Sequence, residues 1–327
     1  MKCFGRLLSL AMAAALAAGC VLPAVAAGAG GAAREIEIAG EAVPLAASPS
    51  GLVLPEASGK LTKTSSRAVI DYSNTQDGYV MVKFTGTTTK RLKVQVAGPS
   101  ASTPKKLVYS YDLKAGEWTT FPLSDGNGNY KVTVAENTNA TKYAVVASVS
   151  FTVTLKDEFA PYLRPNQYVD YAAAAKTVEK ARELAGKETD VLKQVEAVYN
   201  YVVKNFTYDQ QRAATVQSGY LPVLDSVLAE KKGICFDYAG LMTGMLRSLG
   251  VPCKLVTGYV PVGSGATAYH AWISVWSKET GWVDSAIYFD GTNWQRMDPT
   301  FASSSNSSAS IMKYIGDGSN YSVKYTY

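Results

Sequence analysis

Histidine is almost absent from this sequence of 327 residues, which contains one, His270, and four cysteines. Metal centres with nitrogen and sulfur ligands need three or four such side chains close together. Cys3 and Cys20 lie in a first segment with the pattern of a removable export signal, so one histidine and two cysteines remain in the mature chain. The sequence therefore predicts no metal and no other cofactor.

An excess of charge of one sign is also lacking. The formal net charge is +5, and removal of Lys2 and Arg6 with the predicted signal leaves 5 − 2 = +3. No run rich in Lys and Arg occurs, so nucleic acid is not an expected partner. No later stretch reaches the roughly 18 uncharged apolar residues that a membrane-spanning helix needs.

Residues 1–26 are predicted to be a signal peptide. Two basic residues precede the apolar run 7–22, and Ala24-Val25-Ala26 provides an A-x-A cleavage site. The stretch Leu16 to Cys20 resembles a lipobox with its Leu one place too far from the Cys, which leaves open a lipid anchor at Cys20. We expect a bacterial protein that is secreted or held at the cell surface or cell envelope.

The next 130 residues change in character. Residues 27–62 are rich in Ala, Gly, Pro and Ser, which is typical of a flexible linker. From 63 to 158, short runs of alternating apolar and polar residues are separated by turn residues, which predicts an all-β immunoglobulin-like sandwich of about seven strands. The stretch 125–129 is interpreted as a hairpin turn. The expected strands include 68–72, 79–84, 92–96, 107–111, 130–134 and 149–153.

Residues 159–327 are predicted to form a second domain, which begins with helices. Helical periodicity covers 171–185, then a segment capped by Thr189 or Asp190 that ends near Asn205, and a third segment between Gly233 and Gly250. Helices followed by antiparallel strands predict an α+β domain. The strands are expected at 253–260, 271–276, 281–283 and 294–297.

Cys235 falls at the first turn of the third predicted helix, directly after Gly233-Ile234. The positive end of the helix dipole favours a thiolate there and lowers the thiol pKa. The free N–H groups of a helix start can also bind an oxyanion. A cysteine packed as a small apolar residue is the more common alternative.

His270 stands at the start of an alternating strand, just after a Gly-Ser-Gly loop. A lone histidine is more often structural, but an imidazole at a strand end can act as general base and acid for a thiol. Asp298 leaves a later strand and could orient the imidazole, although Asp-Pro also starts turns. Asp284 and, less strongly, Asp290 compete for that role.

The segment from about 190 to 301 resembles the transglutaminase-like core domain, and in particular its exported bacterial members. The resemblance is carried by five stretches in order: Asn205 to Asp209, Gly233 to Ala239, Leu249 to Tyr259, His270 to Trp276 and Trp294 to Thr300.

The resemblance implies a papain-like, transglutaminase-like fold with helices packed on an antiparallel sheet. It implies that Cys235 is the nucleophile, His270 the general base and Asp298 the orienting carboxylate, and it suggests Tyr208 as a support for the oxyanion. Cys253 departs from the family, which more usually has a small apolar residue there. We interpret it as a buried strand thiol.

Three functions follow as alternatives. The first is a peptidase or amidase that acts through a Cys thioester on a protein, a peptide or a cell-wall peptide. The second is a crosslinking transglutaminase that uses an amine acceptor. The third is a non-catalytic binding or scaffolding module, in which the sandwich binds another protein or a surface polymer.

Overall fold

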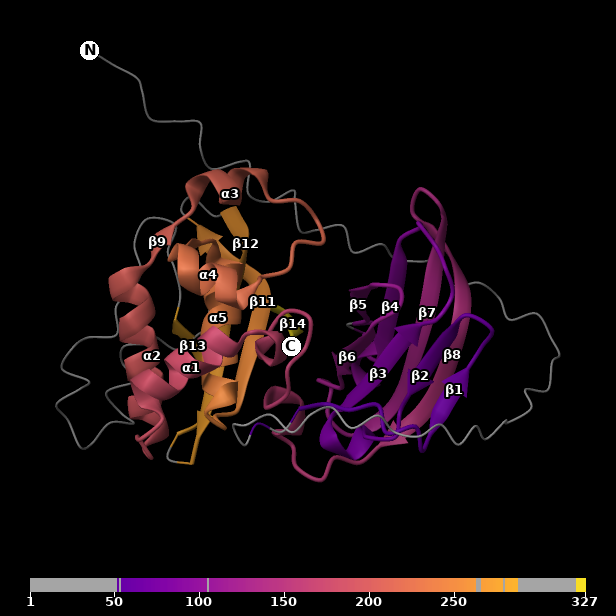
Figure 1. The fold of residues 1–327 in the computed structure, drawn as a ribbon, viewed down its shortest axis with the longest axis horizontal. Helices are drawn as coiled ribbons and strands as arrows, with labels where there is room; N and C mark the ends of the chain where they lie inside the picture. Colours follow the sequence, from indigo (N-terminus) through magenta and orange to yellow (C-terminus); the bar gives the residue numbers. More distant parts are fainter. Residues whose placement is uncertain (1–51, 53, 105, 263–265, 279, 288–321) are drawn as a thin grey trace, which may run out of the picture. The chain divides into compact units, whose positions relative to one another are not determined.

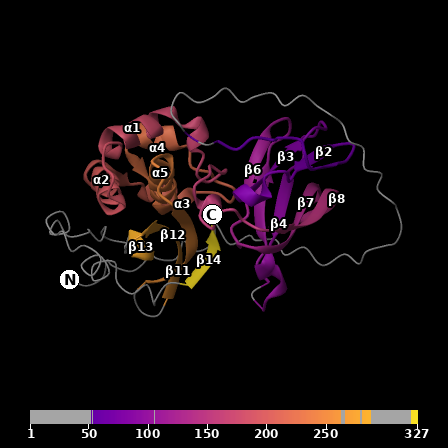
Figure 2. The same ribbon diagram turned by 90° about the horizontal axis from the view of Figure 1, so that it is seen from below.

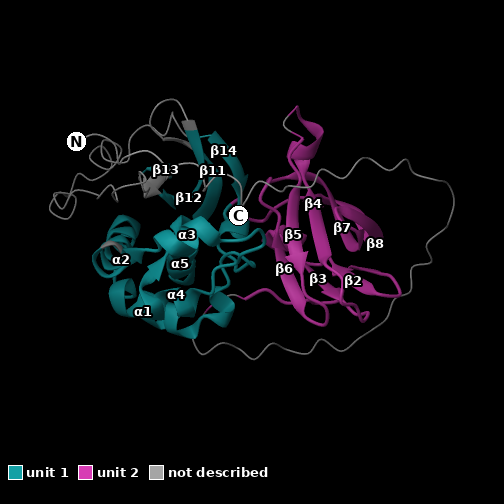
Figure 3. Ribbon diagram, turned by 90° about the horizontal axis from the view of Figure 1, so that it is seen from above, with its two compact units in different colours: residues 1–18, 159–327 teal, residues 19–158 magenta. Residues whose placement is uncertain are grey.

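The computed structural model describes residues 52, 54–104, 106–262, 266–278, 280–287 and 322–327. The predicted signal peptide, Cys20 and the predicted linker as far as residue 51 lie outside the described residues. Contacts divide the chain into two compact units. In chain order, the first unit ends at Glu158 (magenta, keyed as unit 2 in Figure 3) and the second begins at Phe159 (teal, keyed as unit 1). No helix within the described ranges is long and apolar enough to cross a membrane.

The first unit consists of two four-stranded antiparallel sheets (Figure 1). Their strand orders are β1-β2-β3-β6 and β5-β4-β7-β8. The strands are β1 (Thr62–Thr64), β2 (Ala68–Asp71), β3 (Tyr79–Phe84), β4 (Leu92–Ala97), β5 (Tyr109–Leu113), β6 (Trp118–Pro122), β7 (Gly128–Asn139) and β8 (Lys142–Val153).

Side chains of the two sheets share a core. Along β4 the residues alternate between buried and half-buried, as expected for a strand with one face against the core. Tyr111 of the second sheet meets Phe121 of the first edge-to-face, with ring centroids 5.2 Å apart, and Tyr72 stacks on Phe151 at 5.4 Å. A sandwich of sheets is therefore present, and its immunoglobulin-like character stays a prediction.

Two local predictions in this unit are wrong. Residues 56–61, expected to belong to the flexible linker, are tied to the first sheet: Gly59 N–H donates to Asp71 Oδ2 at 2.6 Å and Leu61 N–H to Ser73 Oγ at 2.8 Å. The turn at 125–129 is not a hairpin, because β6 and β7 on either side belong to different sheets. Turn residues indicate a reversal, but not which strands it joins.

In the second unit, helices cover one face of a four-stranded antiparallel sheet of order β13-β12-β11-β14 (Figure 2). The predicted α+β combination of helices and an antiparallel sheet is therefore confirmed. The helices are α1 (Ala175–Ala185), α2 (Val191–Asn205), α3 (Gln210–Thr215), α4 (Leu224–Glu230) and α5 (Cys235–Ser248). The sheet strands are β11 (Cys253–Val262), β12 (Ala266–Ser277), β13 (Gly281–Ile287) and β14 (Ser322–Thr326).

Capping residues explain where α2 begins and where α1 ends. Asp190 is the N-cap of α2, and its Oδ1 accepts from the N–H groups of Leu192 and Lys193. This satisfies two of the donors that a helix start leaves unpaired. Gly186 ends α1, and its N–H donates to the carbonyl of Arg182 at 2.8 Å.

Helix α5 lies at the centre of the second unit. It contacts α1, α2 and α4 as well as β11 and β12, and all of its residues are buried. A helix buried on all sides must satisfy its few charged groups internally. Arg247 does so through the carbonyl groups of Cys253, Arg164 and Tyr327, at 2.8, 2.6 and 2.6 Å. The end of α5 is thus tied to the start of β11 and to Tyr327 beside the sheet.

Candidate active site

Cys235 is the first residue of α5. The preceding Gly233 ends the short strand β10 (Lys232–Gly233), which pairs in parallel with β9 (Thr207–Tyr208). A Cβ added at Gly233 would lie 2.6 Å from Cβ of Asp237, so this close approach of strand and helix requires glycine. The chain therefore turns into α5 in one tight step, which presents Cys235 at the helix start.

The thiol of Cys235 is buried and free, with 5% of the residue exposed. Desolvation raises its pKa to about 11, although the backbone N–H of Ala271 and those of Phe236 and Cys235 itself act in the opposite direction. The predicted effect of the helix start on the pKa is therefore present but smaller than the cost of burying a thiolate. At neutral pH the resting thiol is protonated.

His270 lies on β12, opposite Gly258 of β11. The residue is 5% exposed, and its ring stacks on that of Trp272 with centroids 6.3 Å apart. Burial lowers its pKa to about 4, so the imidazole is neutral at pH 7. Its Nε2 atom is buried and has no hydrogen-bond partner among the described residues. Such an atom is uncommon in a folded protein and is available to a reacting group or to an orienting carboxylate.

The residues on both sides of His270 lie near the thiol. The N–H of Ala271 faces the sulfur of Cys235, and the pKa of Tyr269 is raised chiefly by burial and, to the smallest extent, by the nearby Cys235. In the described part of β13, the last residue paired with β12 is Ile287, opposite Ile273. The structure therefore brings Cys235 close to Ala271 within β12. Because β12 begins at Ala266, His270 lies inside the strand and not at the strand start expected from the sequence.

Tyr208 also lies at the start of α5. The parallel register of β9 and β10 sets it opposite Gly233. The backbone N–H of Cys235 faces the phenol oxygen, while burial and, next, the nearby Cys235 raise the pKa of Tyr208. Its hydroxyl is therefore a neutral group placed directly beside the nucleophile candidate.

Three aspartates are candidates for the carboxylate that orients His270, and one of them, Asp284, lies within the described residues. Asp298 and Asp290 lie outside the described residues. Asp284 lies on β13, next to the strand that holds His270. Within the described ranges, no three His, Cys, Asp or Glu side chains are grouped so that they could bind a metal ion.

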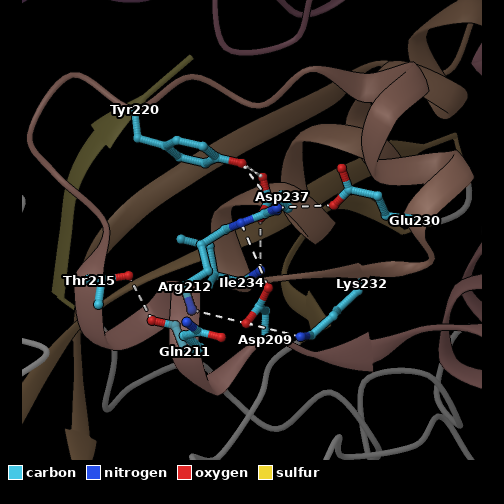
Figure 4. Close-up of polar contacts among 9 residues, drawn as sticks. All are labelled: Asp209, Gln211, Arg212, Thr215, Tyr220, Glu230, Lys232, Ile234 and Asp237. Carbon is cyan, nitrogen blue, oxygen red and sulfur yellow. Dashed lines mark hydrogen bonds and ion pairs between the residues drawn. The ribbon is translucent and has the colours of Figure 1, made fainter.

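Asp237 is a residue of this region that we did not single out from the sequence. Its side chain is completely buried, yet it accepts from Ile234 N–H at 2.9 Å, Tyr220 O–H at 2.5 Å and Arg212 Nη1 at 3.2 Å. Figure 4 shows the Tyr220 hydroxyl and the Arg212 guanidinium both directed at this carboxylate. The three donors balance the cost of burying its charge.

Arg212 connects this carboxylate to two further segments. It bonds to Glu230 of α4 at 3.0 Å, and its own N–H caps α3 by donating to Asp209 at 3.0 Å. Lys232 of β10 lies 3.4 Å from the same Asp209 (Figure 4). An acidic residue three places after a helix cap is a recognisable signal for Asp237. Arg212 and Tyr220 follow no local pattern that predicts their contact with it.

Cys253 lies at the start of β11 and is completely buried. Its thiol donates to Thr243 Oγ1 of α5 at 3.6 Å, and neither it nor Cys235 is in a disulfide. The interpretation of Cys253 as a buried strand thiol is therefore confirmed.

Residues 178–299 match the family model of the transglutaminase-like superfamily. This confirms the resemblance seen in the sequence and identifies a transglutaminase-like core domain within the second unit. The match includes α5, β11, β12 and β13 and extends across Asp298.

Individual relatives match over shorter parts of their length. A protein-glutamine gamma-glutamyltransferase of Pseudomonas aeruginosa is 33% identical over 87 residues, which is 24% of this chain and 13% of that protein. An uncharacterized protein of Mycobacterium tuberculosis is 28% identical over 165 residues, which is 45% of this chain and 46% of that protein. This chain thus spans less than half the length of both relatives.

Among solved structures, a candidate cysteine protease from Cytophaga hutchinsonii is similar with a TM-score of 0.36 and 15% identity. The alignment covers 76% of this chain and 83% of that one.

Proposed function

We propose that the transglutaminase-like core domain is a thiol acyl-transfer enzyme that hydrolyses peptide or side-chain amides through a thioester on Cys235. One observation carries the proposal: the thiol at the start of α5 faces the backbone N–H of Ala271, immediately after the one histidine of the chain. A thiol nucleophile needs donors for the oxyanion and a base; the Ala271 N–H and the start of α5 supply the donors, and we assign the role of base to His270, the one histidine of the sequence.

The first step forms the acyl-enzyme. The Cys235 proton passes to His270 as the sulfur attacks the amide carbonyl, because burial disfavours a separated thiolate and imidazolium before substrate binds. The oxyanion lies at the start of α5 and is stabilised there by the Tyr208 hydroxyl. His270 then gives its proton to the departing amine, and the C–N bond breaks to leave a thioester.

The second step releases the acyl group. Water attacks the thioester while His270 takes its proton, the C–S bond breaks, and the proton returns to the Cys235 sulfur. The products are a carboxylic acid, which releases its proton to the solvent to become a carboxylate, and the free enzyme. We assign Asp298 the role of accepting a hydrogen bond from His270 during these transfers, which would give the buried Nε2 atom a partner.

A second acceptor is also considered. The name of the Pseudomonas relative, a protein-glutamine gamma-glutamyltransferase, supports transfer of a glutaminyl acyl group to a lysine-type amine in place of water. The chemistry at Cys235 would be the same. The two reactions differ in their product, a free carboxylate in one case and a new amide in the other.

We further propose that the protein acts outside the cytoplasm, secreted or at the cell surface. The predicted signal peptide supports this location. The sandwich would then bind a neighbouring protein or a surface polymer and bring the catalytic unit to its substrate. A scaffold without catalysis remains the alternative, and it requires an unreactive Cys235.

The test compares two cysteine variants. Cys235→Ala should lower release of ammonia or amine from glutamine-containing and cell-wall peptides at least about 10³-fold. Cys253→Ala is the matched control, because it removes a buried thiol that contacts Thr243 and should retain activity. Adding a fluorescent primary amine separates hydrolysis from transamidation by its incorporation. Turnover that survives in Cys235→Ala would refute the proposal.

A further inference from the structure

Lys324 lies in a cluster of tyrosine rings beside the candidate nucleophile. Its ammonium is 5.8, 5.9 and 5.5 Å from the ring centroids of Tyr259, Tyr269 and Tyr325. The rings of Tyr259 and Tyr269 meet edge-to-face at 5.4 Å. We call these four residues the lysine–tyrosine cluster. All four are half-buried, so each keeps part of its surface accessible.

An irregularity in the sheet creates the cluster. The pairing of β11 with β14 shifts between Thr257 and Gly258, so Lys324 is an extra residue between Val323 and Tyr325. A bulge of this kind redirects a side chain from its usual face. A Cβ at Gly258 would lie 2.1 Å from the carbonyl oxygen of Ser322, so the close approach of β14 requires glycine at this position.

The cluster lies on the face of the sheet that α5 covers. Cys253 on β11 contacts Thr243 of α5, and Tyr259 shares the face of Cys253 because side chains alternate along a strand. Tyr269 is directly paired with Tyr259. The Tyr269 hydroxyl donates to Thr257 Oγ1 at 2.8 Å, and Tyr269 lies two residues before Ala271, whose N–H faces the Cys235 thiol, on the same face of β12. The cluster therefore begins beside the thiol and extends outward to β14.

Charge decides what such a surface can bind. Among the described residues, no carboxylate forms an ion pair with Lys324. The three tyrosines offer ring faces and hydroxyl groups, which neutralise no cation. An incoming carboxylate would gain an ion pair with the ammonium, and its aliphatic stem would pack on the rings. An incoming ammonium group would be repelled.

We propose that the lysine–tyrosine cluster is a substrate subsite that binds a carboxylate on an acidic peptide whose scissile amide lies at Cys235. This inference rests on the proposed function for the identity of the reacting bond. It names the substrate class of that site, a peptide with a carboxylate one to three residues from the attacked carbonyl. Each residue of an extended peptide spans about 3.3–3.6 Å, so a carboxylate at the first, second or third position reaches successively farther from the attacked carbonyl.

The full chain is treated with short bromoacetyl peptides, which alkylate thiols. Peptide mapping then measures the rate at which Cys235 is alkylated. Each peptide has Glu at the first, second or third position, and a matched peptide has Gln. A third set ends in a free carboxylate, which distinguishes a side-chain carboxylate from a terminal one. At low salt, one Glu peptide or one free-carboxylate peptide should react about two- to fivefold faster than its neutral match, the size expected for a partly exposed ion pair. The preference should shrink at high salt.

Variants identify the group responsible. Lys324→Met should bring the rate ratio of charged to neutral peptide near one, and Lys324→Arg should retain the preference. Lys254→Met is the matched control, since Lys254 also lies over an aromatic ring, that of Trp282 at 3.5 Å, but on the opposite face of β11. Its ratio should equal that of the natural protein. An unchanged ratio in Lys324→Met would overturn the inference.

A binding measurement keeps the inference separate from catalysis. Fluorescein-labelled acetyl peptides of the same sequences bind without reacting, and their anisotropy should show the same Lys324-dependent preference for the carboxylate. If amide turnover fails but this preference holds, the proposed function is wrong and the carboxylate subsite stands. If turnover holds and neither alkylation nor binding depends on Lys324, the subsite is wrong.

Discussion

The backbone N–H of Ala271, the residue directly after His270, faces the thiol of Cys235 and lowers the thiol pKa, against the larger opposite effect of burial. The contact joins the start of a buried helix to β12, an inner strand of the sheet. Because α5 is enclosed on all sides and β12 is paired along its length with β11, neither partner can move without disturbing the core. A rigid placement of this kind is what a thiol nucleophile and its base require.

Tyr208→Phe should lower kcat about 10²-fold with little change in KM. The substitution removes the hydroxyl beside the N–H of Cys235 and leaves the ring in place, so an oxyanion donor is lost without loss of packing. Tyr201→Phe on α2 is the control, since the Tyr201 ring packs on Phe206, away from the thiol. Steady-state kinetics of both variants checks this. An unchanged kcat in Tyr208→Phe would remove Tyr208 from the mechanism.

The free energy of unfolding should decrease as the pH is lowered, because His270 is buried in its neutral form. Burial lowers its pKa to about 4, against about 6.5 in an unfolded chain, so the folded state prefers the neutral imidazole. The contribution to the free energy of unfolding is complete above about pH 6.5 and is lost as pH falls through about 4, by at most about 3 kcal/mol. His270→Gln should lack this loss.

Urea unfolding at pH 7.5 and 4.5, followed by fluorescence of Trp272, Trp276 and Trp282 in the second unit, measures the effect. The carboxyl of Glu136 in the first unit does not interfere with this measurement. The Arg67 hydrogen bond lowers the Glu136 pKa to about 2, so the stability that Glu136 contributes is lost at lower pH. Equal pH dependence in the natural protein and in His270→Gln would show that the imidazole is not buried as described.

Asp237→Ala should lower the free energy of unfolding by about 3–5 kcal/mol. The change leaves Arg212, Tyr220 and the Ile234 N–H without their shared acceptor in a buried position. Asp237→Asn keeps part of the hydrogen bonding and should cost less. As a control, Glu183→Ala removes an exposed ion pair with Lys180 and should cost at most about 1 kcal/mol. Similar values for Asp237→Ala and the control would contradict the described network.

Local patterns predicted most of the regular elements. The strand expected at 79–84 is β3, and the helix capped by Asp190 is α2. The helix that begins with Cys235 follows from Gly233, Gly250 and an apolar sequence between them. These elements are recognisable because caps and alternation act over a few neighbouring residues.

Long-range contacts could not be predicted in the same way. Nothing in the sequence near Lys324 indicates that β14 pairs with β11, or that the Thr257/Gly258 bulge sets Lys324 among three tyrosines. The contact of Arg212 with Asp237 likewise depends on how α3 lies against α5. For Cys235, the helix dipole predicted a lowered pKa, whereas burial raises it, because the degree of burial is a property of the whole fold.

The most direct test of the central claim is to locate an acyl group on the protein. The chain is mixed with p-nitrophenyl acetate, quenched in acid and mapped by mass spectrometry, with His270→Gln treated in parallel. We predict an acetyl thioester on the peptide containing Cys235, strongly reduced in His270→Gln, and an unmodified Cys253. Acetylation of Cys253, or a Cys235 that stays unmodified while turnover proceeds, would contradict the account.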